Sequence, residues 1–245
     1  MSGAARLGTA GWSVPGALAD RFLGPGTHLE RYARVMNAVE INSSFYRPHR
    51  RSTYERWAAS TREDFRFAVK APRVLTHERR LRDPAEALER FADEVAGLGD
   101  RLGVLLVQLP PSLAFDEAVA ARFFDALAER LPVAVACESR HASWFTPDVD
   151  AWMAHRRIAR VAADPAPAPG AGEPGGWRGL TYLRLHGSPR IYYSAYAPEV
   201  LAATARRIAK EASAAPTWCV FDNTAEGCAL PDALTVMAAL GEEPR

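Results

Sequence analysis

The scarcest polar residues of this chain stand at the ends of short apolar runs. Only two lysines occur beside 28 arginines, and one of them, Lys70, closes the run FRFAVK; Gln108, the single glutamine, closes GVLLVQ. A lysine is chemically distinct here, because an ammonium can lose its proton when it is desolvated or lies beside other cations, whereas a guanidinium stays charged. Two of the three asparagines, Asn42 and Asn223, occupy comparable positions. This placement indicates a cluster with a function.

Titratable side chains at the ends of other apolar runs could perform acid–base chemistry. Carboxylates and imidazoles accept and release protons, and guanidinium groups hold anions. The expected catalytic residues are Glu40, Lys70, Glu138 and His186. The expected substrate-binding residues are Asn42, His77, Gln108, Arg140, His141, Trp144, Arg184 and Asn223. The alternative is a structural role, in which Lys70 forms an ion pair with Glu40 or Glu138.

A divalent-metal site is a second interpretation of the same residues. Its donor types are present in His77, His141, His186, Glu40, Glu138 and Asp164. No diagnostic spacing such as HExxH occurs, and the lysine and arginines expected in the same space would repel a cation. We therefore predict no cofactor and no metal ligands, and keep a divalent metal as the alternative.

Two loops rich in arginine follow the second and third apolar runs. They are YRPHRR (46–51) and RVLTHERRLR (73–82), and together they could form a basic arc that binds phosphate or carboxylate. A solvated surface is the alternative. The net charge of the chain is +1, which does not indicate a general nucleic-acid binder. A local basic patch that binds nucleic acid is kept as an alternative. The expected partner is a small anionic molecule.

Strands and helices that alternate along the chain would position these residues. Apolar segments bounded by turn residues predict eight strands, over 6–13, 38–46, 65–72, 103–110, 133–140, 158–165, 181–188 and 217–224. Helical periodicity lies between them, with expected helix starts at a Thr27/Glu30 capping box, at Asp83 followed by Pro84, at Asp116, at Thr146 followed by Pro147, and at Pro198.

This alternation predicts an α/β fold with a parallel sheet, and eight repeats in one domain (1–245) predict a (β/α)8 TIM barrel. The sixth helix is the exception, because PAPAPGAGEPGGWRG (165–179) is too rich in Pro and Gly and predicts a loop. A doubly wound sheet is the alternative, but no GxGxxG or P-loop follows the first strand. In a barrel the carboxyl ends of all the strands share one mouth, where the polar residues would meet.

Length and composition are those of an ordinary globular protein. The chain has 245 residues, of which 48% are hydrophobic and 24% charged. No run approaches the ~20 apolar residues that span a bilayer, and no apolar segment of a secretory signal is visible near Met1. Three cysteines without a CxxC spacing fit a reducing compartment. We expect a cytoplasmic protein with no membrane partner.

Several motifs together are similar to those of the YecE-like family, domain of unknown function 72. They are GTAGWS, VEINSSFYR, FAVKAP followed by LTH, LVQLPPS, ESRHASW, LRLHG and FDNTAEGCAL, and they extend from about Gly8 to Ala239. The resemblance implies a TIM-barrel fold and implies that the twelve expected site residues stand at motif positions of the family. It implies no particular reaction. Asp222 in FDNT departs from the more usual Phe-Asn-Asn pattern.

The expected function is that of an enzyme, of hydrolase or lyase type, which uses acid–base chemistry at the barrel mouth on a small anionic substrate, phosphorylated substrates included. One alternative is a metal-dependent phosphoesterase or nuclease, by analogy of fold alone. The other is a non-catalytic protein that uses the same pocket to bind a metabolite or a nucleic acid.

Overall fold

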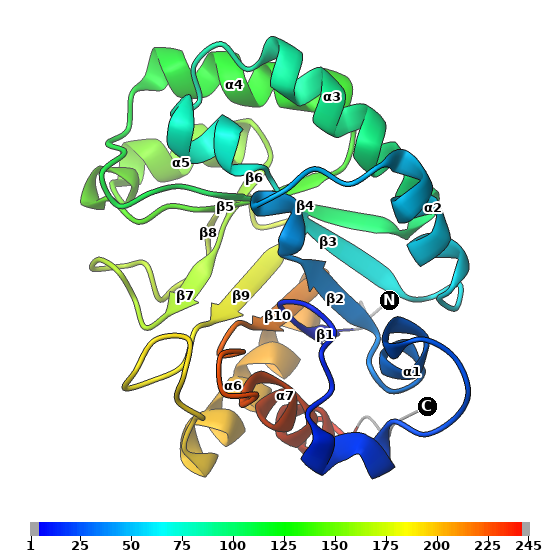
Figure 1. The fold of residues 1–245 in the computed structure, drawn as a ribbon. Coiled ribbons are helices and arrows are strands. Elements are labelled where there is room, and N and C mark those ends of the chain that lie inside the picture. The colour runs from blue at the N-terminus through cyan, green and yellow to red at the C-terminus, as the bar shows by residue number, and fades with distance from the viewer. Residues whose placement is uncertain (1–4, 242–245) are drawn as a thin grey trace.

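Parallel strands alternate with helices along the chain in the computed structural model, which describes residues 5–241 (Figure 1). The strands are β1 (Arg6–Thr9), β2 (Ala38–Ile41), β3 (Arg66–Lys70), β4 (Leu102–Gln108), β5 (Ala134–Glu138), β6 (Ile158–Arg160), β7 (Ala162–Asp164), β8 (Gly175–Gly176), β9 (Thr181–Leu185) and β10 (Thr217–Phe221). The helices are α1 (His28–Val35), α2 (Arg51–Ala59), α3 (Ala85–Val95), α4 (Glu117–Arg130), α5 (Pro147–His155), α6 (Pro198–Ala212) and α7 (Ala229–Ala239). Short helical turns are η1 (Gly16–Arg21), η2 (Ser43–Phe45), η3 (Val74–Glu78), η4 (Ala96–Arg101) and η5 (Ala142–Trp144).

The strands form two sheets in the orders β1-β10-β9-β7 and β2-β3-β4-β5-β6-β8, and every pair is parallel except β6 with β8. Each predicted strand segment contains a strand, so the predicted α/β class with parallel sheets is confirmed. A closed barrel is not detected within residues 5–241. Sheet pairing is interrupted at Val161, which separates β6 from β7, and β1 meets β2 through a single bridge between Ala10 and Glu40.

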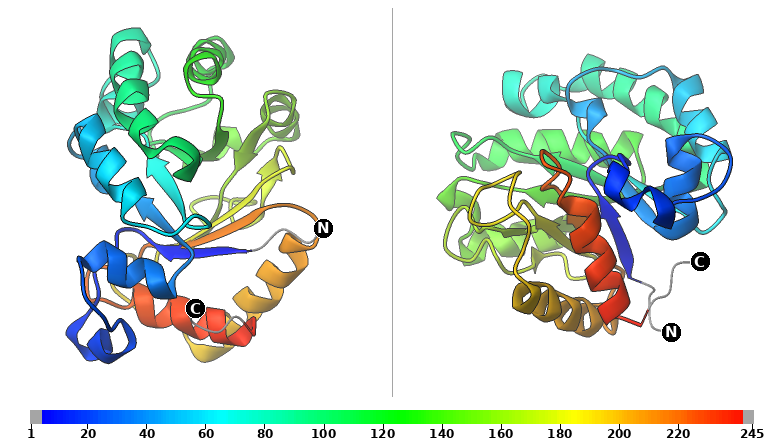
Figure 2. Two further views of the ribbon diagram at one scale, coloured as in Figure 1. Left: turned by 90° about the vertical axis from the view of Figure 1, so that its right-hand side faces the viewer. Right: turned by 60° about the horizontal axis from the view of Figure 1, so that its bottom comes forward.

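Two buried layers follow from the alternation of side chains along each strand. Every second residue faces the helices, as Val39, Val69 and Val107 do, and joins a core with the apolar faces of the helices. The residues between them face a second, smaller core shared by strands of both sheets, which contains Ala68 and Val220. Helices α2 to α5 cover one half of the fold, and α7 packs against α6 and β1 in the other half (Figures 1 and 2).

Gly8 permits the close approach of β1 to β2. A Cβ at this position would clash with the backbone carbonyl of Ala38. The gap between the two sheets is therefore narrow at this point, and the Ala10–Glu40 bridge follows directly after it. The glycine thus helps to place the start of the second sheet, on which Glu40 lies.

Most helix starts follow the predicted capping chemistry. The Thr27/Glu30 capping box forms, and the side chains of Asp116 and Thr146 accept hydrogen bonds from the third residue beyond each cap. The prediction for Asp83 is wrong: α3 begins at Ala85 after Pro84, without a side-chain cap, and the backbone of Asp83 has a positive φ of 44°, outside the extended region that is typical of an N-cap.

The segment 165–179 contains no helix, as predicted. The side chain of Arg160 holds it in place by donating hydrogen bonds to the carbonyls of Gly170 (2.9 Å) and Glu173 (3.2 Å). Within this segment β8 pairs with β6 in antiparallel orientation. In the described part of the chain, every helix is too short or too polar to cross a lipid bilayer.

Candidate functional site

Polar side chains converge at the carboxyl ends of strands from both sheets. Glu40, Lys70, Glu138 and Arg184 follow inward-facing residues of β2, β3, β5 and β9 by two positions, so that alternation directs them to the same side. We call the following set the mouth network, because ion pairs or charge interactions connect its members: Glu40, Lys70, Glu138, Arg140, Arg184, His186 and Asp222. The predicted convergence of the four expected catalytic residues is confirmed.

Arg184 lies at the centre of the mouth network and is completely buried. Its Nε and Nη2 donate to the two carboxylate oxygens of Glu40 at 3.1 and 2.8 Å, and its Nη1 donates to Oε2 of Glu138 at 2.9 Å. Its Nη2 also lies 3.0 Å from Oδ2 of Asp222. Burial alone would lower the pKa of Arg184, but the three carboxylates outweigh it and raise the pKa well above its usual value.

Glu40 is enclosed by hydrogen-bond donors. Besides the two bonds from Arg184, its Oε2 accepts a hydrogen bond of 3.0 Å from the hydroxyl of Tyr182. Glu40 is 0% exposed, so that a substrate has no path to its oxygens. The geometry favours a role in fixing Arg184 over direct proton transfer. Sequence reasoning missed Tyr182, which in a strand of alternating apolar residues looks like an ordinary core side chain.

Glu138 lies between two guanidinium groups. Its Oε1 accepts hydrogen bonds from Nε and Nη2 of Arg140, at 2.9 and 2.8 Å, while Oε2 is held by Arg184. Burial would raise the pKa of Glu138, but Arg184, then His186 and Arg140, hold it well below the usual range. A carboxylate whose pKa is held low and whose oxygens are already paired is a weak proton acceptor, which favours a role for Glu138 in orienting its neighbours.

His186 and Asp222 form a buried pair. Nδ1 of His186 lies 3.0 Å from Oδ2 of Asp222 within hydrogen-bond distance. Nε2 lies 3.3 Å from Oε1 of Glu138, at ion-pair distance, and is fully enclosed. Burial would lower the pKa of His186, and Glu138 together with the Asp222 bond overcomes this and raises it. The imidazole is thus held between two carboxylates, with Asp222 at Nδ1 and Glu138 at Nε2.

Asp222 was not among the expected site residues, although a signal was present in the sequence. It follows Val220, an inward-facing residue of β10, by two positions. Burial would raise its pKa, but the adjacent Arg184 and His186 lower it, so the carboxylate is ionised when it orients the imidazole.

Lys70 stands apart from the ion pairs. It is 5% exposed, and its Nζ lies 4.2 Å above the centroid of the Phe45 ring. Its ammonium makes no hydrogen bond or ion pair with the described residues, so the pairing with Glu40 or Glu138 considered as the structural alternative is not found. Burial, followed by the charge of Arg184, lowers the pKa of Lys70 to about 8, against the opposing effect of the three carboxylates.

His77 lies beside Lys70 at the same end of the fold. Its ring contacts the Phe45 ring edge-on, with centroids 4.9 Å apart, and Nδ1 lies 2.9 Å from Oγ1 of Thr76. Burial, then the charges of Lys70 and Arg140, lowers its pKa to about 4. His77 is therefore neutral at physiological pH.

Gln108 and Asn42 also lie at the carboxyl ends of their strands. Gln108 is buried and pairs in register with Glu138 across β4 and β5. Asn42 follows β2, and its Oδ1 is enclosed without a hydrogen-bond partner in the described chain. Asn42 is two residues from Glu40 along the chain, and Gln108 is beside Glu138 across the sheet.

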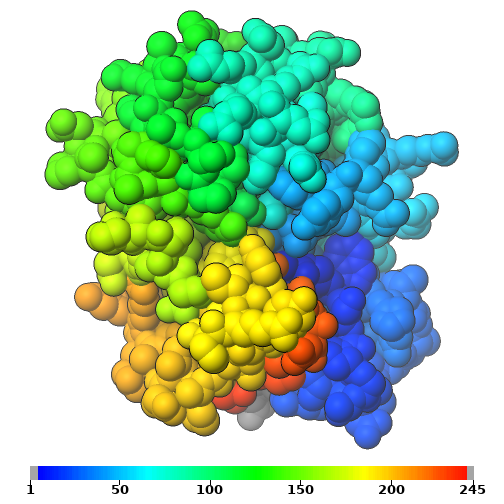
Figure 3. All heavy atoms as spheres, turned by 60° about the vertical axis from the view of Figure 1, so that its left-hand side comes forward, coloured from blue at the N-terminus to red at the C-terminus, as the bar shows by residue number. Residues whose placement is uncertain are grey.

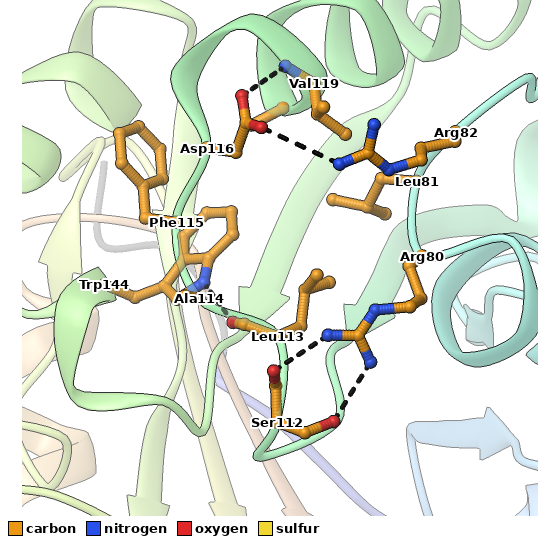
Figure 4. Close-up of a pocket in the computed structure, with 11 residues that line it drawn as sticks. Arg80, Leu81, Arg82, Ser112, Leu113, Ala114, Phe115, Asp116, Val119 and Trp144 are labelled. Atoms are coloured by element: carbon orange, nitrogen blue, oxygen red, sulfur yellow. Dashed lines mark hydrogen bonds and ion pairs between the residues drawn. The ribbon is translucent and has the colours of Figure 1, made fainter.

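Three expected binding residues make other contacts. Nδ1 of His141 lies 2.9 Å from Oγ of Ser143, and Nδ2 of Asn223 donates to the carbonyl of Ser194 and to Asp232. Trp144 is buried, donates from Nε1 to the carbonyl of Leu113, and lines a separate cavity of about 260 Å³ (Figure 4). The contacts of all three fix loops around the mouth network.

The predicted basic arc is partly neutralised. Arg51 pairs with Glu55 and Asp93, Arg79 with Glu86, and Arg82 with Asp116. Arg80 donates to the carbonyl and hydroxyl of Ser112, as Figure 4 shows. A solvated surface describes these arginines better than a free anion site.

Of the metal donors considered from the sequence, Glu40, Glu138 and His186 lie in the mouth network, where Arg184 pairs with both carboxylates. Oδ1 of Asp164 accepts a hydrogen bond of 2.9 Å from Tyr196, and His141 caps η5. Over the described range, no three side chains of His, Cys, Asp or Glu are placed to hold a metal ion together.

The segment after β9 borders the mouth network. Tyr192 has a positive φ of 71°, its ring centroid lies 5.6 Å from that of His186, and its hydroxyl lies 3.4 Å from Nη2 of Arg140. This segment (yellow) lies on the surface between the two halves of the fold in Figure 3. Sequence periodicity gave no indication of this loop conformation, so Tyr192 was not expected at the site.

Curated relatives match parts of the chain. The "UPF0759 protein YecE" of Escherichia coli (strain K12) is 31% identical over 147 residues, which cover 58% of this chain and 53% of the relative. The "UPF0759 protein YunF" of Bacillus subtilis (strain 168) is 25% identical over 147 residues, 58% of this chain and 52% of the relative. The match spans about half the length of these relatives.

Solved structures and a family model match nearly the whole chain. A DUF72 family protein from Thermotoga maritima MSB8 has a TM-score of 0.80 at 26% identity, covering 97% of this chain and 99% of that one. A DUF72 family protein from Enterococcus faecalis V583 has a TM-score of 0.81 at 21% identity, covering 97% and 96%, which shows the fold alone. The model "Protein of unknown function DUF72" matches residues 6–245. The chain therefore belongs to the DUF72 family, as its motifs predicted.

Proposed function

We propose that the protein is an enzyme that acts on a small anionic substrate by proton transfer at the mouth network. We also infer that the two sheets are halves of one (β/α)8 barrel in a single domain. The narrow Gly8 junction and the direct succession of β6 and β7 support this. In such a barrel the carboxyl ends of the strands form the usual position of an active site.

The observation that carries this proposal is the buried imidazole of His186, which lies between the carboxylates of Asp222 at Nδ1 and Glu138 at Nε2. A carboxylate that holds Nδ1 fixes the orientation of the imidazole and stabilises its charged form. Nε2 is enclosed 3.3 Å from Oε1 of Glu138, so it can give a proton to a substrate, or take one, only when the substrate takes the place of that contact. Arg184 is saturated by carboxylates and serves as the rigid support of this pair, because it contacts both Asp222 and Glu138.

The charge balance of the mouth network supports an anionic substrate. Its cations are Arg140, Arg184, Lys70 and His186, and its carboxylates are Glu40, Glu138 and Asp222. When the lysine and the histidine are protonated, one positive charge remains. Arg140, with 21% of its side chain exposed, and Lys70, which makes no ion pair with the described residues, are the cations that we expect to meet an incoming anion.

A screen of small phosphorylated and carboxylated compounds with His186→Gln tests the proposal. General acid–base catalysis contributes about 10²–10⁴ in rate, so the variant should lose about that factor in kcat on whatever compound the wild type turns over. His155→Gln is the matched control, since His155 is exposed on α5, and should retain full activity. Full turnover by His186→Gln would refute the assignment, and tight binding of a compound that is never turned over would favour a binding protein.

A further inference from the structure

We propose that Lys70 is a nucleophile for carbonyl compounds: its uncharged amine adds to an aldehyde or ketone that carries an anionic group, and the adduct becomes an imine. This inference rests on the site proposed above and names its substrate class. It assigns to Lys70 a covalent role that acid–base chemistry at His186 does not require.

The first observation is that the Lys70 amine is uncommitted. All three carboxylates of the mouth network are taken up by other groups: Glu40 by Arg184 and Tyr182, Glu138 by Arg184 and Arg140, and Asp222 by Arg184 and His186. Because guanidinium and imidazole already satisfy these carboxylates, Lys70 is left without an ion pair among residues 5–241.

The second observation is the surroundings of Nζ. The residue is 5% exposed, and the face of the Phe45 ring lies 4.2 Å below Nζ. Nζ is not among the fully enclosed polar atoms that lack a partner, so it retains some contact with solvent. A desolvated lysine beside another cation is the environment that activates an amine as a nucleophile.

The electrostatics agree with this geometry. Burial and Arg184 lower the pKa of Lys70 to about 8. At pH 7 about a tenth of the molecules then carry the uncharged amine, a few hundred times more than for an ordinary lysine. An arginine at this position could bind an anion equally well but could not supply a free amine.

The reaction balances without any further reagent. The nitrogen lone pair forms a bond to the carbonyl carbon while the π electrons move to oxygen, which gives a carbinolamine after proton transfer. The carbon–oxygen bond then breaks, and the two protons that nitrogen has lost leave with the oxygen as water. No oxidant or reductant takes part. Arg140, which lies at the same mouth, can hold the anionic group of the substrate.

The chain offers an internal control, because its only other lysine is Lys210, which is exposed on α6. Glyoxylate, a small aldehyde with a carboxylate, is the probe, and cyanoborohydride reduces any imine to a stable secondary amine. Peptide mapping then measures the fraction of Lys70 and of Lys210 modified in the same wild-type molecules at pH 7. We expect Lys70 to be labelled about tenfold faster than Lys210, less than the ratio of free amine because a weaker base is a weaker nucleophile. Labelling of Lys210 at an equal or higher rate in the folded protein would overturn the proposal.

Two variants extend the test. Lys70→Arg should abolish the fast labelling and leave the slow labelling of Lys210 unchanged, whereas Lys210→Arg should keep the fast labelling. Since the comparison within the wild type needs no variant, a folding defect in Lys70→Arg leaves the test decisive.

The outcomes separate this inference from the proposed function. If Lys70 is not labelled but His186→Gln loses turnover, the imine proposal fails and the acid–base site stands. If Lys70 is labelled rapidly but His186→Gln keeps full turnover, the acid–base assignment fails and the imine proposal stands.

Discussion

Arg184 and Glu40 are joined by two hydrogen bonds, of 3.1 and 2.8 Å, and both side chains are completely buried. This bidentate pair joins β9 of one sheet to β2 of the other. Both sheets therefore share one charged centre, and the orientation of Glu138 and Asp222 depends on it.

Removal of the arginine should destabilise the fold strongly. Arg184→Met leaves three buried carboxylates with too little positive charge, and loss of one partner of a buried ion pair costs about 3–5 kcal/mol. Urea denaturation monitored by circular dichroism measures the free energy of unfolding. Arg56→Met on α2 is the control, because Arg56 is exposed, and should change it by less than about 0.5 kcal/mol. Equal stability of the two variants would show that the buried network does not support the fold.

The hydroxyl of Tyr182 should contribute to the same centre. Tyr182→Phe removes the 3.0 Å hydrogen bond to Glu40 and nothing else from a fully buried ring. A hydrogen bond to a charged group is worth about 1.5–3 kcal/mol, so the free energy of unfolding should fall by that amount. Tyr46→Phe, at a side chain that is 72% exposed, serves as the control in the same denaturation experiment. A loss no greater than that of the control would contradict the importance of this bond.

The fold class and the convergence of the site follow from the sequence because both depend on alternation along strands. Glu40, Lys70, Glu138 and Arg184 lie two residues beyond small or apolar inward-facing positions, so their direction is set by the strand itself. Interruption of the sheets could not be predicted, because it depends on backbone pairing at Val161 and at the Ala10–Glu40 bridge.

Residues beyond the strand ends were harder to place. Trp144 and Asn223 follow strands closely, but each donates a hydrogen bond to the backbone of another loop, which no periodic pattern encodes. Tyr192 is brought to the site by a loop in which its own backbone has a positive φ. Asp83 does not cap α3, and its backbone has a positive φ as well. Local backbone conformation, set by tertiary contacts, decides these cases.

The imidazole of His186 should stabilise the protein most at low pH. Its pKa in the folded state is raised above the usual value of 6.5. The contribution of His186 to the free energy of unfolding is therefore complete below the pKa of the unfolded state and disappears as the pH rises through the pKa of the folded state. The difference in free energy of unfolding between wild type and His186→Gln should be larger at pH 5.5 than at pH 9, with His155→Gln showing no such trend. A difference that grows with pH would show that the Asp222 pair does not favour the charged ring.

Lys70 should have the opposite pH dependence. Its folded pKa of about 8 lies below the usual 10.5, so between these values the unfolded chain binds more protons than the folded one, and stability rises with pH. A pKa difference of this size between the folded and unfolded states changes the free energy of unfolding by about 3 kcal/mol over the whole range. Relative to Lys70→Met, which has no titrating group, the wild type should therefore gain stability between pH 8 and pH 10.5.

Urea denaturation at several pH values measures this gain. Other groups that titrate in the same range are common to both proteins, so the difference between wild type and variant isolates Lys70. Lys210→Met is the matched control, since Lys210 is exposed and should show no pH-dependent difference from the wild type. If the difference for Lys70→Met were flat across this range, the amine would have an ordinary pKa. An ordinary pKa would mean that little uncharged amine is present at neutral pH. The covalent role of Lys70 would then rest on the labelling ratio alone.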